Sequence, residues 1–190
     1  MLSITQIKKG TLIVIDGAPF EIIDYAHSHV GRGGSVVQVK IRNLITGNVF
    51  DRNFKPSDKF KEAEIEKKKA IFIYAHKGEI VLQNPTNPKK RWSLEEKIVG
   101  DKLPYLKPKT EVELIEFENE IVNINLPVKI DYLVKEAPPS EKGNTAQGGS
   151  KRITLETGLQ INTPFFISTG DIVRVNTETG QYVERISKGV

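Results

Sequence analysis

The sequence predicts a mainly β protein divided into three small barrel domains. Short β-type runs alternate with turn residues at spacings of about 8 to 12 positions, which is typical of small barrels and sandwiches. The length of 190 residues is enough for three such domains, each with a limited core. We place the domains at residues 1–63, 64–126 and 127–190.

The first domain is expected to be an SH3-like barrel of four or five strands. Thr11–Ile15 runs into Asp16-Gly17, a residue pair that strongly favours a tight hairpin turn. The alternating runs Phe20–Tyr25 and Val36–Ile41 predict a second hairpin. A further strand follows a Thr-Gly-Asn turn.

The second domain is expected to be an OB-type barrel, because its strands are combined with one short helix. A charged stretch, Lys59–Lys69, leads the chain into it. Ser93 and Glu96 have capping-box spacing for the start of the helix, and Gly100 suits its end. The predicted strands of this domain are Ala70–Tyr74, Ile80–Leu82, Val112–Phe117 and Ile121–Ile124.

The third domain is also rich in predicted strands. Gly143–Lys151 has no apolar periodicity, so we expect it to form an exposed loop. Turn residues separate the later strands. The predicted strands are Val128–Lys135, Ile153–Glu156, Leu159–Ile161, Phe165–Ile167, Ile172–Val175 and Tyr182–Ile186.

The tip of the second hairpin combines one arginine with three glycines. Gly31, Gly33 and Gly34 surround Arg32, and glycine allows the positive φ that a tight reversal requires. Two interpretations are open. Arg32 is either a solvated turn residue or a cation held out toward an anionic partner.

Composition narrows the functional classes. The net charge is +4 and the sequence pI is about 9.1, which is compatible with a nucleic-acid partner. The absence of cysteine excludes disulfides, thiolate metal sites and cysteine nucleophiles. No apolar run approaches the ~20 residues of a membrane span, and the first residues lack the apolar core of a signal peptide. We therefore expect a soluble, cytoplasmic protein.

The sequence predicts no catalytic, cofactor or metal site. Neither a Walker phosphate loop nor a dinucleotide motif is present. His27 and His29 could begin a zinc site, but no third ligand with suitable spacing is evident. The carboxylates are typical of a solvated outer face, although only they and the histidines would favour an enzyme acting on a small polar substrate. These carboxylates are Glu111, Glu113, Glu116, Glu118 and Glu120.

Two basic runs have open interpretations. Lys67–Lys69 and Lys89–Arg91 are either solvated or bind an anionic partner. Trp92, directly after the second run, either stacks on a base or covers a small core.

Several motifs occur in an order that resembles bacterial translation elongation factor P over essentially the whole chain. The tip around Arg32 and the Asn53-Phe54 pair are similarly placed in that family. The most specific matches lie in the last third of the chain: Gly143-Asn144-Thr145, Gly148-Gly149-Ser150-Lys151, Leu155-Glu156-Thr157-Gly158, Pro164-Phe165-Phe166-Ile167, Gly170–Val175 and Thr177–Arg185.

The resemblance implies an elongated, L-shaped monomer with one SH3-like (KOW-type) barrel followed by two OB-fold barrels. Its implied partners are the 70S ribosome and peptidyl-tRNA, and it would relieve stalling at consecutive prolines without being an enzyme. Arg32 would approach the CCA end of the tRNA. Many members carry lysine there, and some arginine-bearing members are rhamnosylated, so Arg32 would act either bare or after modification by an arginine rhamnosyltransferase.

The resemblance also implies contacts for the last third of the chain. A loop containing Gly143, Asn144, Thr145, Gly148, Gly149 and Lys151 would face the codon in the exit site. Tyr182 and Arg185 would lie near the small-subunit end. Asn144 replaces a usual aspartate. Two alternatives remain: a divergent elongation factor P-like paralogue, and a general single-stranded nucleic-acid-binding OB protein.

Overall fold

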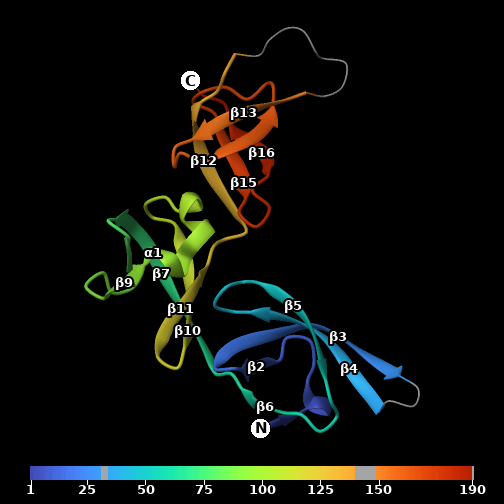
Figure 1. Ribbon diagram of the computed structural model, residues 1–190. Coiled ribbons are helices and arrows are strands. Elements are labelled where there is room, and N and C mark those ends of the chain that lie inside the picture. The colour runs from blue at the N-terminus through green and yellow to red at the C-terminus, as the bar shows by residue number, and fades with distance from the viewer. Residues whose placement is uncertain (31–33, 140–148, 190) are drawn as a thin grey trace. The chain divides into compact units, whose positions relative to one another are not determined.

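The computed structural model describes residues 1–30, 34–139 and 149–189, with the side chains of 26–30, 34 and 35 excepted. The described residues form three antiparallel sheets and little helix, so the predicted mainly β fold class is confirmed (Figure 1). Within these residues, no helix is long and apolar enough to cross a membrane.

The N-terminal sheet has the strand order β1-β6-β2-β3-β4-β5. Its inward-facing side chains form one buried cluster centred on Ile13, Ile22, Val39 and Ile41. A short 3-10 helix (Ile4–Gln6) contributes Ile4 to this core. The strands are β1 (Leu2–Ser3), β2 (Leu12–Ile15), β3 (Ala18–Val30), β4 (Gly34–Asn43), β5 (Val49–Phe54) and β6 (Lys59–Glu62).

Local turn chemistry sets the connections of this sheet. Asp16 and Gly17 both have positive φ, 51° and 79°, so the predicted β2–β3 turn is confirmed. Gly47, with φ 77°, turns the chain between β4 and β5. Asn43 supports that turn because its side-chain oxygen accepts hydrogen bonds from the backbone N–H groups of Ile45 and Thr46.

The second sheet has the order β11-β10-β7-β8-β9. The charged stretch Lys59–Lys69 contains β6 and the start of β7. One expectation for this region is wrong. Ser93 does not cap the helix, since it is extended in β9 and pairs with Val81. The strands are β7 (Ile65–His76), β8 (Glu79–Gln83), β9 (Arg91–Glu95), β10 (Glu111–Phe117) and β11 (Glu120–Asn125).

The helix therefore begins later than the sequence predicts. It is α1 (Glu96–Val99), and it continues into a 3-10 helix (Gly100–Tyr105). Gly100 is the C-cap of α1, as predicted, and has φ 55°. A positive φ at this position ends the α-helix in the conformation that glycine adopts most easily.

The C-terminal sheet has the order β14-β13-β12-β15-β16. Tyr132, Leu155, Ile167 and Val173 are fully buried in its core. The predicted strand Phe165–Ile167 is wrong, because β14 ends at Pro164 and the chain then turns. The strands are β12 (Lys129–Glu136), β13 (Ser150–Leu155), β14 (Gln160–Pro164), β15 (Ile172–Asn176) and β16 (Tyr182–Ser187).

The chain divides into two compact units. The first contains Met1–Lys68 and Leu114–Ile124, and the second contains Lys69–Glu113 and Asn125–Val190. In the first unit, the buried Asn123 side chain donates hydrogen bonds to the carbonyl oxygens of Leu44 and Ile45, at 2.8 and 3.0 Å.

Candidate functional site

The predicted tip lies at the end of a long hairpin arm formed by β3 and β4. The thirteen residues of β3 span about 40 Å at about 3.4 Å per residue. Only the first part of β3, Ala18–Glu21, pairs with β2. The remainder of β3 has β4 as its partner, which leaves the hairpin to extend from the barrel (Figure 1).

The outermost part of the arm is a two-stranded ribbon. β5 pairs with β4 no farther out than Val37, whereas the β3–β4 ladder continues to the pair Val30 and Gly34. Gly34 is therefore the first residue of β4. Three predicted tip residues lie outside the described residues: Gly31, Arg32 and Gly33.

A bulge changes the faces of β3 at the base of the arm. The register shifts between Ile22 and Asp24, so Ile23 is the extra residue. Ile22 is fully buried, while Tyr25 is 43% exposed. Below the ribbon, a shallow groove of about 220 Å³ is lined by Asp24, Tyr25, Gln38, Lys40 and Asp51. This part of the arm is polar and accessible to a partner.

The base of the predicted codon-facing loop is held by two contacts. Lys151 Nζ donates a hydrogen bond to the carbonyl oxygen of Pro138, at 2.9 Å, and so joins the two sides of the loop. Gly149 lies against Phe165, whose ring would come within 2.1 Å of an added Cβ. Four predicted residues fall outside the described part of the chain: Gly143, Asn144, Thr145 and Gly148.

Tyr182 is partly a core residue. It pairs with Val175 in the β15–β16 ladder and packs against the buried C-terminal cluster. Burial raises the pKa of its phenol, and neighbouring Arg185 acts in the opposite direction. The rest of its side chain remains accessible, so Tyr182 can both support the barrel and contact a partner.

Arg185 is engaged within the C-terminal barrel. Its guanidinium lies 5.0 Å from the ring centroid of Phe166 and 3.3 Å from a carboxylate oxygen of Asp171. Phe166 is 57% exposed, so the stacked pair forms part of the surface. These contacts hold the planar guanidinium in one orientation.

Asp171 is the buried centre of this arrangement, with an exposure of 1%. Its carboxylate accepts hydrogen bonds from the backbone N–H groups of Ser168 and Gly189, at 3.0 and 2.8 Å, as well as from Arg185. Burial alone would raise the pKa of Asp171, but these three donors outweigh it and the pKa is lowered. The carboxylate therefore links Gly189 to Arg185 of β16.

Sequence reasoning did not identify Asp171 or Phe166 as parts of the site. Both fall within the motifs that carry the family resemblance, and Asp171 follows a glycine in a predicted turn. That local signal indicates a turn. It contains no information on Arg185, which approaches from another strand.

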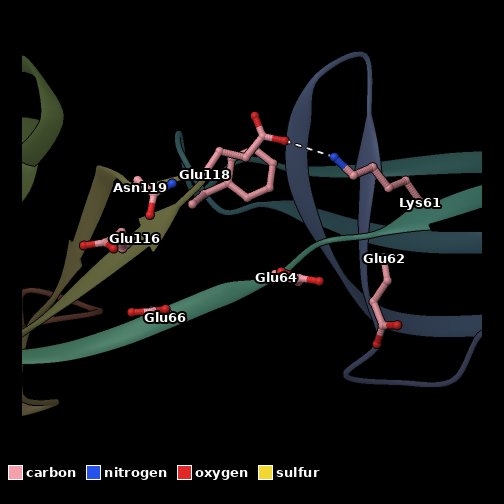
Figure 2. A pocket seen from close by; sticks show the side chains of 8 residues that line it. Lys61, Glu62, Glu64, Glu66, Glu116, Glu118 and Asn119 are labelled. Carbon is pink, nitrogen blue, oxygen red and sulfur yellow. Dashed lines mark hydrogen bonds and ion pairs between the residues drawn. The ribbon is translucent and has the colours of Figure 1, made fainter.

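Two of the carboxylates that could favour an enzyme, Glu116 and Glu118, line an open acidic pocket in the first unit together with Glu62, Glu64 and Glu66 (Figure 2). Glu116 accepts hydrogen bonds from Lys68 Nζ through both carboxylate oxygens, each at 2.6 Å. Glu118 accepts one from Lys61 Nζ at 3.1 Å. The predicted solvated face holds for Glu111, Glu118 and Glu120, which are exposed, whereas Glu113 and Glu116 are half-buried.

The described residues contain no group of three or more histidine, cysteine or carboxylate side chains arranged to hold a metal ion. His27 and His29 are two positions apart in β3, and their side chains lie outside the part of the structure that is described.

Two family models match the chain. Residues 3–60 match the elongation factor P (EF-P) KOW-like domain, and residues 130–185 match the elongation factor P C-terminal domain. The KOW-like match covers the N-terminal sheet and the β3–β4 arm.

Curated relatives match over almost the whole chain. Elongation factor P of Natranaerobius thermophilus is 35% identical over 186 residues, covering 98% of each chain. Elongation factor P of Thermotoga petrophila is 36% identical over 185 residues, covering 97% of this chain and all of the relative.

A solved structure of eukaryotic translation initiation factor 5A from Methanococcus jannaschii is similar to 66% of this chain and 90% of its own, with a TM-score of 0.48 and 20% identity. The family models and the full-length relatives agree on the assignment at both ends of the chain. The chain therefore belongs to the elongation factor P family, and it is a translation elongation factor.

Proposed function

We propose that this elongation factor binds the 70S ribosome and stabilises the acceptor end of peptidyl-tRNA in a geometry that favours peptide transfer. Arg32 is the residue that approaches the CCA end. It acts mainly on ribosomes that have stalled at consecutive prolines. In this mechanism the protein positions the reactants and is not an enzyme.

The β3–β4 arm is the observation that carries this proposal. The ribbon extends beyond β5 and ends at the Val30–Gly34 pair, with Gly31, Arg32 and Gly33 between its strands. An arginine at the end of such an arm can reach a site that the barrel itself cannot enter. Its guanidinium can bind phosphate oxygens bidentately, and it remains charged at all physiological pH values.

Positioning is sufficient to account for the effect on proline. Proline lacks a backbone N–H and restricts the conformation of the residue before it, which makes it a poor participant in peptide transfer. Holding two reactants in alignment can lower a barrier by several kcal/mol without acid–base chemistry. The ion-paired carboxylates around Glu116 and Glu118 are consistent with a factor that has no catalytic group.

The C-terminal barrel supplies the second proposed contact. We assign the loop that includes Gly143, Asn144, Thr145, Gly148, Gly149 and Lys151 to the exit-site codon, and Tyr182 and Arg185 to the small-subunit end. The Lys151–Pro138 hydrogen bond and the Phe165 ring against Gly149 support this assignment, because they hold the base of the loop.

We also propose that the factor acts as a monomer in the cytoplasm, where its ribosomal partner is found. The proposed domains are residues 1–63, 64–126 and 127–190. An arginine rhamnosyltransferase is the proposed modifying enzyme if Arg32 carries a sugar.

The alternative functions have less support. A general single-stranded nucleic-acid binder would not require relatives named elongation factor P that match 97–98% of the chain. The same matches argue against a divergent protein with a different role.

The test of the proposal is translation of a Pro-Pro-Pro reporter beside a proline-free template in a purified system. Arg32→Ala should slow the proline template about tenfold or more, since a hydrogen bond to a charged group contributes about 1.5–3 kcal/mol. Arg52→Ala, which removes an exposed arginine of β5, is the matched control and should change neither template. Equal rates for Arg32→Ala and wild type on the proline template would refute the role of Arg32.

The modification is tested separately. Intact-mass spectrometry of protein from its native host should show whether the Arg32 peptide carries one additional deoxyhexose. Rhamnosylation predicts that protein made without the transferase is less active on the proline template. A bare Arg32 predicts equal activity from both sources.

A further inference from the structure

The turn between β8 and β9 carries a compact basic patch, formed by Lys89, Lys90 and Arg91 and called here the β9 patch. All three residues are exposed and consecutive in sequence. Arg91 is the first residue of β9, which is an edge strand of its sheet (Figure 1). The patch stands out because residues 64–126 contain equal numbers of basic and acidic residues, eleven of each.

None of the three cations forms an ion pair with any residue that the structure describes. Two other cations of the same unit are ion-paired. Lys97 pairs with Glu95, and Lys107 pairs with Glu156. Exposed cations that form no ion pair within the protein are available to an external anion.

The turn that presents the patch is held in one conformation. The side-chain oxygen of Asn84 accepts hydrogen bonds from the backbone N–H groups of Thr86 and Asn87 and from the Thr86 hydroxyl, at 2.8 to 2.9 Å. The backbone of Lys90 is bonded on both sides, to Asn84 and Asn87. A partner that binds here therefore orders side chains only, which reduces the entropic cost of binding.

The pairing of β8 with β9 decides between the two interpretations of Trp92. Trp92 is opposite Leu82, which is fully buried, so the indole faces the core and covers its edge. Lys90 Nζ lies 5.5 Å from the centroid of the Trp92 rings. Trp92 thus lies on the core-facing side of β9, and its ring holds the Lys90 ammonium by a cation–π contact.

Arg91 points to the other side of the strand. It pairs with Gln83, on the face opposite the Leu82–Trp92 pair. The β9 patch therefore places cations on both faces of one edge strand. Cations arranged in this way can contact phosphates of both strands that flank a groove of helical RNA.

We propose that the β9 patch is a contact for the phosphates of helical RNA on the ribosome, separate from the Arg32 tip and from the C-terminal loop. This inference rests on the proposed ribosome-binding function and adds a third contact, in the central part of the chain. It assigns electrostatic affinity to the patch and no role at the reacting atoms.

The experiment compares two triple variants that each remove three positive charges. Lys89→Gln/Lys90→Gln/Arg91→Gln tests the patch. Lys77→Gln/Lys109→Gln/Lys135→Gln is the matched control, because these lysines are also exposed and belong to the same unit. Affinity for 70S ribosomes and for a short RNA duplex is measured over a range of KCl concentrations, with Arg32 intact.

Loss of the patch should reduce the slope of log affinity against log salt by about 2 to 3, and should weaken binding about 10- to 100-fold at 0.1 M salt. The control variant should lose less of the salt slope and less of the affinity. Identical behaviour of the two variants with ribosomes and with duplex would overturn the proposal. Because Arg32 is intact, a failure here leaves the result of the proline reporter unaffected, and the duplex arm remains decisive even if ribosome binding fails.

A photo-crosslinking residue in place of Lys89 provides the second measurement, in an otherwise unchanged chain. Crosslinks to ribosomal RNA support the proposal, and crosslinks only to ribosomal proteins contradict it. Charges on an edge strand also prevent pairing with a second copy. If the patch variant self-associates and still binds RNA as tightly as the control variant, the patch serves to prevent strand pairing between copies, and the RNA-contact proposal is wrong.

Discussion

Asp171 shows how one buried residue organises a functional surface. Its carboxylate binds the N–H groups of Ser168 and Gly189 and the guanidinium of Arg185. Gly189 can approach because it has no side chain; an added Cβ would lie 2.7 Å from the backbone carbon of Gly170. The orientation of Arg185 at the surface therefore depends on a residue that no partner can touch.

The first prediction concerns Asp171→Asn. The pKa of Asp171 is lowered in the folded protein, so its ionised form stabilises the fold at pH values above its unfolded pKa of about 4. We expect Asp171→Asn to lower the melting temperature at pH 7. The difference from wild type should shrink as the pH falls below about 4 and Asp171 becomes protonated.

Thermal unfolding from pH 7 to pH 3 measures this effect. Asp58→Asn is a useful comparison, because Asp58 is also a turn carboxylate that accepts a backbone N–H, from Lys55, but it is only half-buried. A destabilisation by Asp171→Asn that is equally large at pH 3 would show that charge is not the cause.

At the scale of the elements, the turns and the edges of the sheets differ in how they are determined. The β10–β11 turn uses Glu118 and Asn119, both with positive φ, 51° and 67°. Two positive φ angles suit the right-handed twist of a two-residue hairpin. The sequence pair Glu-Asn accomplishes this with a side chain at each position, which costs some backbone strain.

Replacing Asn119 with glycine should therefore stabilise the protein. We expect Asn119→Gly to raise the free energy of unfolding by about 0.5–1 kcal/mol, since glycine adopts positive φ without steric cost. Chemical denaturation measures the change. The same substitution at Asn48, whose φ is not positive, should destabilise the protein, and stabilisation at both sites would contradict the argument.

The helix after β9 illustrates the opposite case, in which pairing overrides a local signal. The spacing of Ser93 and Glu96 predicts a capping box, but Ser93 is held extended by its register with Val81. Edge pairing uses hydrogen bonds along the whole of β9, whereas a cap satisfies one or two backbone N–H groups. The helix consequently starts at Glu96.

At the scale of the whole molecule, the C-terminal barrel depends on residues outside the proposed third domain. The buried Tyr132 hydroxyl donates a hydrogen bond to the carbonyl oxygen of Tyr105, at 2.6 Å. Lys107 Nζ binds the carbonyl oxygen of Asp131 and the carboxylate of Glu156, at 2.6 and 2.9 Å. The segment before residue 127 thus completes the polar contacts of this barrel.

These contacts predict the behaviour of an isolated 127–190 fragment. In the full chain, Tyr132→Phe should lower the free energy of unfolding by about 1 kcal/mol, because it removes the hydroxyl that donates a hydrogen bond to Tyr105. In the fragment, the same substitution should be neutral or stabilising, because the hydroxyl has already lost Tyr105. Equal costs in both, measured by thermal unfolding, would show that the Tyr105 contact contributes nothing.

Features that depend on neighbouring residues, and the family motifs, could be predicted from the amino-acid sequence. The turns at Asp16-Gly17 and Gly47 were predictable because positive φ is a local property. The alternation around the arm predicted its two strands, although β3 and β4 extend farther than the apolar pattern does. The ordered motifs from Gly143 to Arg185 were sufficient to indicate the elongation factor P family.

Contacts between side chains that are distant in sequence became visible in the folded chain. Folding placed Arg185 against Asp171 and Phe166, turned Trp92 toward the core and left the β9 patch without an acidic partner among the described residues. The positions of Arg185 and Trp92 depend on strand register, and a shift of one residue would turn either side chain to the other face of its sheet. Register is set by long-range pairing and by the packing of the core, which no local stretch of sequence specifies.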